Sequence, residues 1–210
     1  MAGDITEQLR QTYNYIAPAW HKNRVNDTWW IPVTEKYISL LKPGAIVLDV
    51  GCGSGITAEY LMDRGVSVIG FDISEEMTAL ARKNVPNGKF FVLDMHETDS
   101  ISEKFGGVLM RASLLHIQRD QAAAIVQKMA TLLELGGFLY IAVKEVKENG
   151  LLEEFKMEED FGMTFTRFFS YFTLLEIKEF MTVAGLDIVH ESVTPSGRSR
   201  WIEVIGQKPL

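Results

Sequence analysis

The stretch that decides the fold is VLDVGCGSG, residues 47–55, where an apolar run ends in three glycines at alternate positions. A short apolar run that stops at glycines is typical of a buried strand in a parallel sheet. Glycine loses more backbone freedom on folding than any other residue, so a turn rich in glycine is costly to order. We therefore expect the turn that follows Val50 to approach a bound ligand closely.

Strand-like and helix-like segments alternate outward from this turn. Strands are expected over 45–50, 66–72, 89–94, 107–112 and 138–144, and helices over 56–64, 75–83 and 119–133. Ser74 precedes the second of these helices as an N-cap. Strands that alternate with helices form a parallel sheet that is covered on both faces.

The C-terminal part of the chain predicts a reversal of strand direction. A helix is expected over 173–184, followed by strands over 186–193 and 200–207 that a Thr-Pro-Ser-Gly turn joins into a hairpin. The fold class is therefore α/β. We expect a doubly wound, mostly parallel seven-stranded sheet, with helices on both faces and an antiparallel C-terminal strand pair.

The chain shows no internal repeat or linker, so we expect one domain over residues 1–210. Its parts are an N-terminal helical cap (1–44), a ligand-binding core (45–144), a lid over the substrate (145–172) and a C-terminal helix with hairpin (173–210). In the cap, helices are expected over 4–24, interrupted at Pro18, and over 32–41. The lid is too long for an ordinary connection. Its acidic run predicts a solvated helix face, formed by Glu153, Glu154, Glu158, Glu159 and Asp160.

Composition limits the partners that this chain can have. The 210 residues are 47% hydrophobic and 23% charged, with a net charge of −7. An acidic chain without a run of Lys or Arg argues against nucleic acid as the main partner. The start of the chain lacks the apolar segment of a signal peptide, and no apolar run is long enough to cross a membrane. We expect a cytoplasmic monomer or homodimer that binds no membrane. A single cysteine and four scattered histidines predict no metal site.

The glycine spacing distinguishes between three kinds of ligand site. A phosphate-binding P-loop requires Lys after its last glycine, and Ile56 follows Gly55 here. A dinucleotide fingerprint has the pattern Gly-x-Gly-x-x-Gly, and here the third glycine comes one position early. The remaining pattern is Gly-x-Gly-x-Gly preceded by an acidic residue, Asp49.

With that pattern, VLDVGCGSG resembles the first motif of the class I S-adenosylmethionine-dependent methyltransferases. Further motifs of that family are similar to VIGFDIS (68–74), VLDMHE (92–97), SLLHI (113–117), LELGGFLYIAV (133–143) and YNYIAPAW (13–20). The resemblance implies S-adenosylmethionine as cofactor and methyl transfer by direct displacement to a small molecule that the sequence does not identify. The chain departs from the family at Gly106, where an aspartate is usual, and this predicts a frayed or shifted strand over 107–112.

The resemblance also implies which residues hold the cofactor. Asp72 would accept from both ribose hydroxyls, Asp94 from the adenine amino group beside Met95, and Asp49 would orient the methionine part. The other implied contacts are Gly51, Cys52, Gly53, Gly55, Ile73, Ala112, Tyr13 and Trp20. Asp72 and Asp94 each have an alternative interpretation as a turn or helix cap. The alternative for Asp49 is a buried structural acceptor for loop amides. Cys52 is interpreted as a small residue in a crowded turn rather than as a reactive thiol.

Methyl transfer from a sulfonium mainly needs alignment, and a base only where the acceptor must lose a proton. His116 follows the strand over 107–112 and is the candidate for catalysis and for substrate contact, because neutral imidazole accepts a proton near pH 7. The alternative is that His116 caps the next helix or binds loop backbone.

Aromatic residues and one cation are candidates for the substrate side. Tyr13, Tyr15 and Trp20 would close over the sulfonium by cation–π attraction, or else belong to a helix core. Arg167 lies in the aromatic run TFTRFFSYF and indicates an anionic substrate, or else a salt bridge to a nearby glutamate. Residues 1–30 and 145–172 are expected to form the substrate chamber together.

Two other functions stay open at this point. A nicotinamide-dependent oxidoreductase shares the fold, although the glycine spacing opposes it. A regulator that binds the cofactor without turnover would keep Asp72 and Asp94 and lack methyl transfer.

Overall fold

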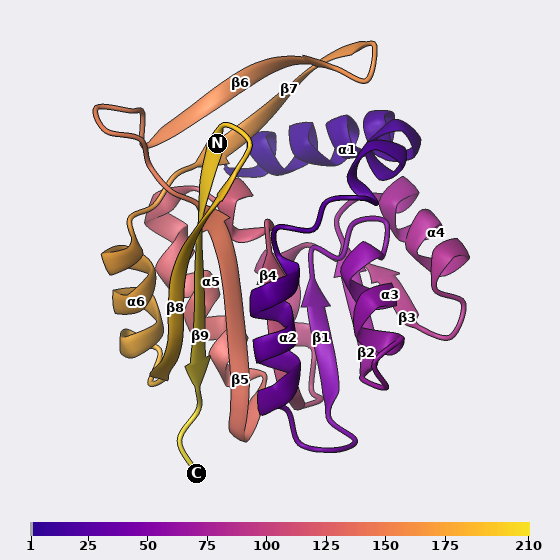
Figure 1. Cartoon of the computed structure of the whole chain (residues 1–210). Coiled ribbons are helices and arrows are strands. Elements are labelled where there is room, and N and C mark those ends of the chain that lie inside the picture. The colour runs from indigo at the N-terminus through magenta and orange to yellow at the C-terminus, as the bar shows by residue number, and fades with distance from the viewer. Residues whose placement is uncertain (1) are drawn as a thin grey trace.

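The computed structural model describes residues 2–210, so the first residue of the expected N-terminal cap lies outside it. Its centre is a seven-stranded sheet in the order β3-β2-β1-β4-β5-β9-β8 (Figure 1). The strands are β1 (Ile46–Val50), β2 (Ser67–Asp72), β3 (Lys89–Val92), β4 (Phe105–Arg111), β5 (Leu133–Lys144), β8 (Asp187–Ser196) and β9 (Ser199–Gln207). Strands β1 to β5 pair in parallel, and β9 runs antiparallel to β5 and β8. This confirms the predicted fold class.

Helices cover both faces of the sheet. On one face, α2 (Ile31–Leu40), α3 (Ile56–Met62) and α4 (Glu75–Asn84) share a core with Val47. On the other, α5 (Arg119–Thr131) and α6 (Leu174–Val183) share a core with Leu48. Val47 and Leu48 are both fully buried, because successive side chains of a strand point to opposite faces. Burial on both faces explains why β1 reads as a continuous apolar run.

The order of the strands fixes where a ligand site can lie. The chain builds β2 and β3 outward on one side of β1 and then crosses to β4 on the other side. At such a reversal the connections leave in opposite directions, and a crevice forms at the carboxyl ends of the strands. The glycine turn after β1 is at this point.

Strand β4 is shifted and not frayed, which is one of the two outcomes expected from Gly106. It begins two residues before the predicted start, at Phe105, and pairs with both β1 and β5, with a register shift between Phe105 and Gly107. A Cβ on Gly107 would collide with the hydroxyl of the fully buried Tyr37. The glycine thus allows α2 to pack closely on β4.

Helix α1 (Ala2–Arg24) is continuous, so the predicted interruption at Pro18 is wrong. Proline inside a helix removes one backbone hydrogen bond and costs about 3 kcal/mol. The two residues before it, Ile16 and Ala17, are fully buried. Tertiary packing of this kind stabilises helices more than intrinsic propensity does.

The acidic lid segment forms strands, so the predicted helix face there is also wrong. Strands β6 (Glu153–Asp160) and β7 (Met163–Ser170) make a separate antiparallel sheet that turns at Phe161 and Gly162. The exposed Phe155 lies opposite the buried Phe168 on the neighbouring strand, with ring centres 5.3 Å apart.

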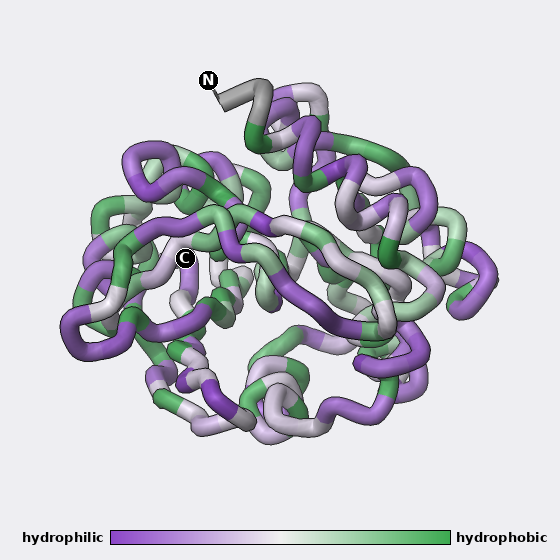
Figure 2. The backbone as a smooth tube through the Cα atoms, turned by 90° about the horizontal axis from the view of Figure 1, so that it is seen from above, coloured by the Kyte–Doolittle hydropathy of each residue, from purple (hydrophilic) through white to green (hydrophobic). Residues whose placement is uncertain are grey.

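The hairpin β6–β7 and α1 lie together across the end of the main sheet (Figure 1). Figure 2 shows this end from above, with both elements toward the viewer. The Thr12 hydroxyl of α1 donates to the carbonyl oxygen of Thr166 in β7. Among the residues that the structure describes, no helix combines the length and the apolar character needed to span a bilayer.

Candidate functional site

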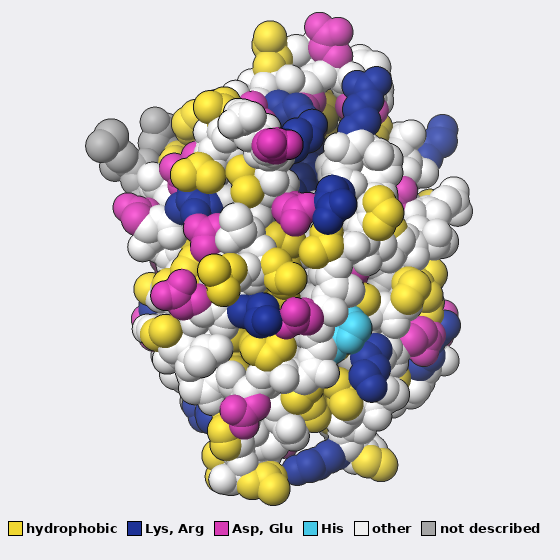
Figure 3. Space-filling view, turned by 60° about the vertical axis from the view of Figure 1, so that its left-hand side comes forward, with side chains coloured by type: hydrophobic (Ala, Val, Ile, Leu, Met, Phe, Trp, Pro, Cys, Tyr) yellow, Lys and Arg dark blue, Asp and Glu magenta, His cyan; other side chains and the backbone are white. Residues whose placement is uncertain are grey.

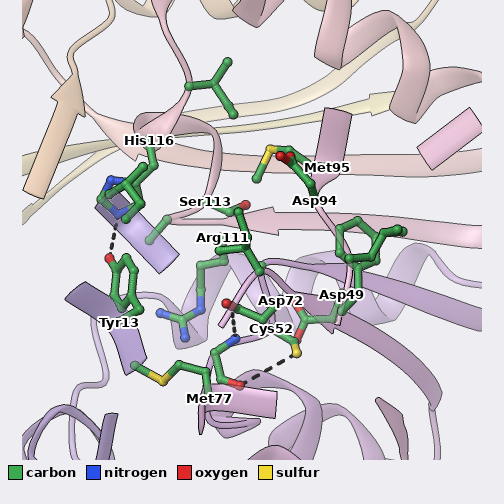
Figure 4. A pocket seen from close by; sticks show the side chains of 18 of the residues that line it. Tyr13, Asp49, Cys52, Asp72, Met77, Asp94, Met95, Arg111, Ser113 and His116 are labelled. Carbon is green, nitrogen blue, oxygen red and sulfur yellow. Dashed lines mark hydrogen bonds between the residues drawn. The ribbon is translucent and has the colours of Figure 1, made fainter. Parts of the chain in front are cut away.

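A cavity lies at the carboxyl ends of β1, β2 and β4, under α1 (Figure 4). Most of the cofactor-contact candidates from the sequence line it, together with His116. They are Tyr13, Trp20, Asp49, Gly51, Cys52, Gly53, Asp72, Ile73, Asp94, Met95 and Ala112. Gly55 does not line it: this glycine begins α3 and packs against Ala81 and Val85. The structure therefore gathers residues that the chain separates by up to about 100 positions.

The glycine turn is built from left-handed backbone. Gly51, Gly53 and Gly55 have φ values of +72°, +52° and +85°. Residues with a Cβ rarely adopt this backbone region. A Cβ on Gly51 would lie 2.5 Å from the Cβ of Ser113. The turn thus needs glycine both for its conformation and for the close approach of the loop after β4.

Asp72 ties the glycine turn to the start of α4. One carboxylate oxygen accepts from the backbone N–H of Gly53 and the other from that of Ser74, each at 2.9 Å. Burial raises the pKa of Asp72 above its usual value, and these backbone amides oppose the rise. The carboxylate is therefore both a cavity wall and a structural acceptor.

Asp49 is buried and Arg111 is half-buried, and both line the cavity, where the charge of each acts on the other. Burial raises the pKa of Asp49 to about 7, and its Oδ2 has no partner in the described part of the chain. The Arg111 guanidinium donates to Thr57 Oγ1 at 2.7 Å and lies 4.7 Å from the ring of Trp30. Arg111 was not a candidate from the sequence, although a charged residue at the end of the apolar run GVLMR indicates a candidate site.

The unpartnered polar atoms allow a test of the implied cofactor. Asp49 Oδ2 and Ser113 Oγ are buried without partners in residues 2–210, and both residues line the cavity. A buried acceptor without a donor is costly unless a ligand supplies one. S-adenosylmethionine carries an ammonium group that supplies such a donor, so the residues present fit this cofactor.

Asp94 behaves as a cap as well as a cavity wall. Its Oδ1 accepts from the backbone N–H of His96 at 2.9 Å and lies 2.7 Å from His96 Nδ1. The hydrogen bond to Asp94 is the main reason why the pKa of His96 is raised. His96 also lines the cavity, and the sequence analysis did not select it.

Cys52 is buried within the glycine turn. Burial, reinforced by the nearby Asp72 and Asp49, raises the pKa of its thiol well above the usual value. A thiol in this setting stays protonated and unreactive. This supports the interpretation of Cys52 as a small residue in a crowded turn.

His116 takes part in a chain of hydrogen bonds with Tyr13 and Arg167. Its Nδ1 lies 2.7 Å from the carbonyl oxygen of Phe168, which only accepts, so Nδ1 carries the proton. Its Nε2 therefore accepts from the Tyr13 hydroxyl at 2.6 Å (Figure 4), and that hydroxyl accepts from Arg167 at 3.1 Å. Burial lowers the pKa of His116 to about 3. An imidazole that is hard to protonate and already occupied at Nε2 is a poor base at neutral pH.

Replacing Tyr13 by phenylalanine should lower the free energy of unfolding by about 1–3 kcal/mol, because it leaves His116 Nε2 and one Arg167 donor, both partly buried, without a protein partner. Urea unfolding measures the change. The matched control is Tyr15→Phe on the same helix, which should stay within about 0.5 kcal/mol of the original protein. Equal stabilities for the two variants would contradict the hydrogen-bond chain.

Tyr15 lies away from both cavities, so the sequence interpretation of its position was wrong. Its exposed fraction is 59%, whereas Tyr13 and Trp20 line the site. Residues 13 and 20 are seven apart and share a helix face, while position 15 turns about 200° away from position 13.

A second cavity of about 470 Å³ shares a wall with the first. The residues common to both are Tyr13, Trp20, Ile56, Arg111, Ala112 and His116. The second cavity extends between α1, the end of β5, strand β7 and the turn between β8 and β9. Both flanking segments contribute side chains to this cavity, and so does the C-terminal turn, which the sequence did not predict. That the cavity is the substrate chamber stays a prediction.

Arg167 lines the second cavity, and its charge is already paired. Its guanidinium donates to both oxygens of Glu158, at 2.7 and 2.9 Å. This is the salt bridge that the sequence analysis kept as the alternative to an anionic substrate.

Comparisons with known proteins agree with this geometry. Residues 47–137 match a family model described as a methyltransferase domain. A ubiquinone biosynthesis O-methyltransferase from Actinobacillus pleuropneumoniae is 29% identical over 139 residues, which are 55% of this chain and 58% of that relative. The chain thus spans about half of the length of this curated relative.

Solved structures share the fold over nearly the whole chain. A Burkholderia thailandensis 1,6-didemethyltoxoflavin-N1-methyltransferase has a TM-score of 0.78 at 19% identity, covering 100% of this chain and 91% of that one. The magnesium protoporphyrin IX methyltransferase of Synechocystis has a TM-score of 0.72 at 17% identity, covering 98% and 100%. At these identities the likeness extends to the fold alone. Residues 47–137 thus match a methyltransferase domain in sequence, and the fold of nearly the whole chain is that of solved methyltransferases.

Proposed function

We propose that this protein transfers a methyl group from S-adenosylmethionine to a small-molecule acceptor by direct displacement. The observation that carries the proposal is the cavity at the point where the strand order reverses. The glycine turn, Asp49, Asp72 and Asp94 line it, and Asp49 Oδ2 is buried there without a partner in the described residues. When bound, the cofactor supplies an activated methyl group on its sulfonium. Asp72 would hold the ribose, Asp94 the adenine amino group and Asp49 the ammonium.

Alignment and exclusion of water are the protein's main tasks in such a reaction, and alignment alone contributes about 7–11 kcal/mol. Tyr13 and Trp20 cover the junction of the two cavities, where the acceptor would meet the methyl group. We assign His116 the role of orienting the Tyr13 hydroxyl toward this junction. The low pKa of His116 argues against the base role expected from the sequence.

The second cavity supports a small molecule as acceptor. Side chains from many separate parts of the chain bound it, and a space of about 470 Å³ fits a small molecule better than a macromolecule. A cytoplasmic location and a monomeric or homodimeric state stay predictions of the sequence.

A thermal-shift screen tests the proposal. S-adenosylmethionine and S-adenosylhomocysteine should stabilise the protein by about 2.7 kcal/mol at 100 times their dissociation constants, because they bind only the folded state. NAD and ATP should leave the midpoint unchanged. Stabilisation by NAD alone would favour an oxidoreductase. Binding of S-adenosylmethionine without methyl transfer to any acceptor would favour the non-catalytic regulator.

A further inference from the structure

The second cavity is basic, although the chain as a whole is acidic. Five cationic side chains line it, and Asp27 is the one acidic side chain that does so in the described part of the chain. The cations come from α1, β4, β5, β7 and the turn between β8 and β9: Arg24, Arg111, Lys144, Arg167 and Arg198. On the outer face in Figure 3, basic and acidic side chains are interspersed instead. A cleft lined by one sign of charge attracts ligands of the opposite sign.

Three of these cations already have partners. Arg24 lies 3.4 Å from Asp160 and 3.7 Å from Asp27, and the arginine of β7 forms its salt bridge with Glu158. Arg111 donates a hydrogen bond to Thr57, and the negative charge of the buried Asp49 stabilises its positive charge. These cations are accounted for by the protein itself.

Lys144 differs, because its ammonium has no ion-paired or hydrogen-bonded partner within residues 2–210. It lies 4.1 Å from the ring centre of Phe169 and 5.8 Å from that of Trp201. Burial, reinforced by Arg167, lowers its pKa from 10.5 to about 8. Desolvating an ammonium without an anion is costly, and contact with aromatic rings compensates only in part. Arg198 is exposed at the mouth of the same cavity.

Flat aromatic surface adjoins this lysine. Trp29 and Trp201 stack with ring centres 4.1 Å apart and an angle of 19° between their planes. Both line the cavity, with Trp20, Tyr13 and Phe169. Stacked rings of this kind offer a face on which another planar ring packs well.

We propose that the methyl acceptor is a planar, conjugated molecule that carries an anionic group, and that Lys144 binds this group with help from Arg198. The inference rests on the proposed function, because it takes the second cavity as the acceptor site. The anionic group is a carboxylate or a phosphate, since both accept from an ammonium. The plane of the acceptor packs beside the Trp29–Trp201 stack, and its reacting atom reaches the junction beside Tyr13.

Three matched probes test this proposal: 2-naphthoate, 2-naphthyl phosphate and the neutral 2-naphthamide. Their dissociation constants are measured by quenching of tryptophan fluorescence with S-adenosylhomocysteine at saturation. At least one anion should bind at least about tenfold more tightly than the amide, as expected for one charge-assisted contact. The tighter of the two anions identifies the carboxylate or the phosphate as the preferred group.

Variants then assign the selectivity to one side chain. Lys144→Met should abolish the preference for the anion, Lys144→Arg should keep it, and the exposed control Lys147→Met should leave it unchanged. Equal binding of the amide and both anions, a preference that survives Lys144→Met, or no binding of any probe overturns the proposal. Failure of S-adenosylhomocysteine to bind the original protein, measured separately by calorimetry, would instead overturn the proposed function.

The pH dependence gives a second readout. The charged side chains that act on Lys144 are Arg24, Lys156, Arg167 and Glu158. The pKa of Arg167 is raised and that of Glu158 is lowered, so both side chains stay charged near pH 8. Affinity for the anionic probe should therefore fall as pH rises through about 8, where Lys144 loses its proton. Lys144→Arg should remove this fall, and a fall that persists in it would contradict the assignment.

Discussion

Replacing Asp72 by asparagine should weaken the binding of S-adenosylhomocysteine by roughly 10- to 150-fold, or about 1.5–3 kcal/mol. The carboxylate accepts from Gly53 and Ser74 and so holds the glycine turn and the start of α4 beside the cavity. The amide has nearly the same shape, but its NH₂ group faces a backbone donor where an oxygen had accepted. It also removes the negative charge expected to receive the ribose hydroxyls.

Isothermal calorimetry measures the change, with Asp63→Asn as the matched control. Asp63 is exposed at the end of α3, away from the cavity, so the same substitution there should leave the affinity unchanged. Urea unfolding without ligand separates lost binding from lost stability. Wild-type affinity in a folded Asp72→Asn protein would mean that another residue holds the ribose.

Replacing Gly51 by alanine should destabilise the protein by about 2–5 kcal/mol. Left-handed backbone costs a residue with a Cβ about 1–2 kcal/mol, and overpacking adds about 1–3 kcal/mol. The overpacking is specific, because the new Cβ would lie 2.5 Å from the Cβ of Ser113. Relief of that contact would push the loop after β4 away from the turn and disturb the cavity between them.

Gly65→Ala isolates the cost of the backbone conformation. Gly65 has a φ of +79°, and its added Cβ would meet nothing within 4 Å. It should therefore cost about 1–2 kcal/mol. Adding Ser113→Gly to Gly51→Ala should recover the difference between the two alanine variants. Equal costs for Gly51→Ala and Gly65→Ala in urea unfolding would show that the contact with Ser113 is absent.

The main sheet could be predicted because each parallel strand carries its own local signal. The runs ending at Val50 and Asp72 are apolar on both faces and bounded by turns, so neither depends on a distant partner to be recognised. The two segments whose structure was predicted wrongly depend on distant partners. Helix α1 passes through Pro18 because of its packing, and β6 is a strand because β7 pairs with it. A charge run alone does not distinguish a helix from the edge of a hairpin.

The cavity was predictable to the same degree. Asp72 and Asp94 each follow a strand, and carboxyl ends of parallel strands gather at one edge. Arg111 and Lys144 end apolar strands too, and they carried a signal that the sequence analysis did not use. The stack of Trp29 on Trp201 had none, because residues so far apart in sequence meet only after the antiparallel strands have formed.

Helix α1 forms part of the wall of both cavities through Tyr13 and Trp20. It is held to β7 by the bonds from Thr12 to Thr166 and from Arg167 to Tyr13, and to the loop after β4 by the bond from Tyr13 to His116. A movement of this helix that admits a ligand to one cavity therefore opens the other cavity as well. Cofactor and acceptor would share a single gate, so a change that loosens α1 should speed the release of both.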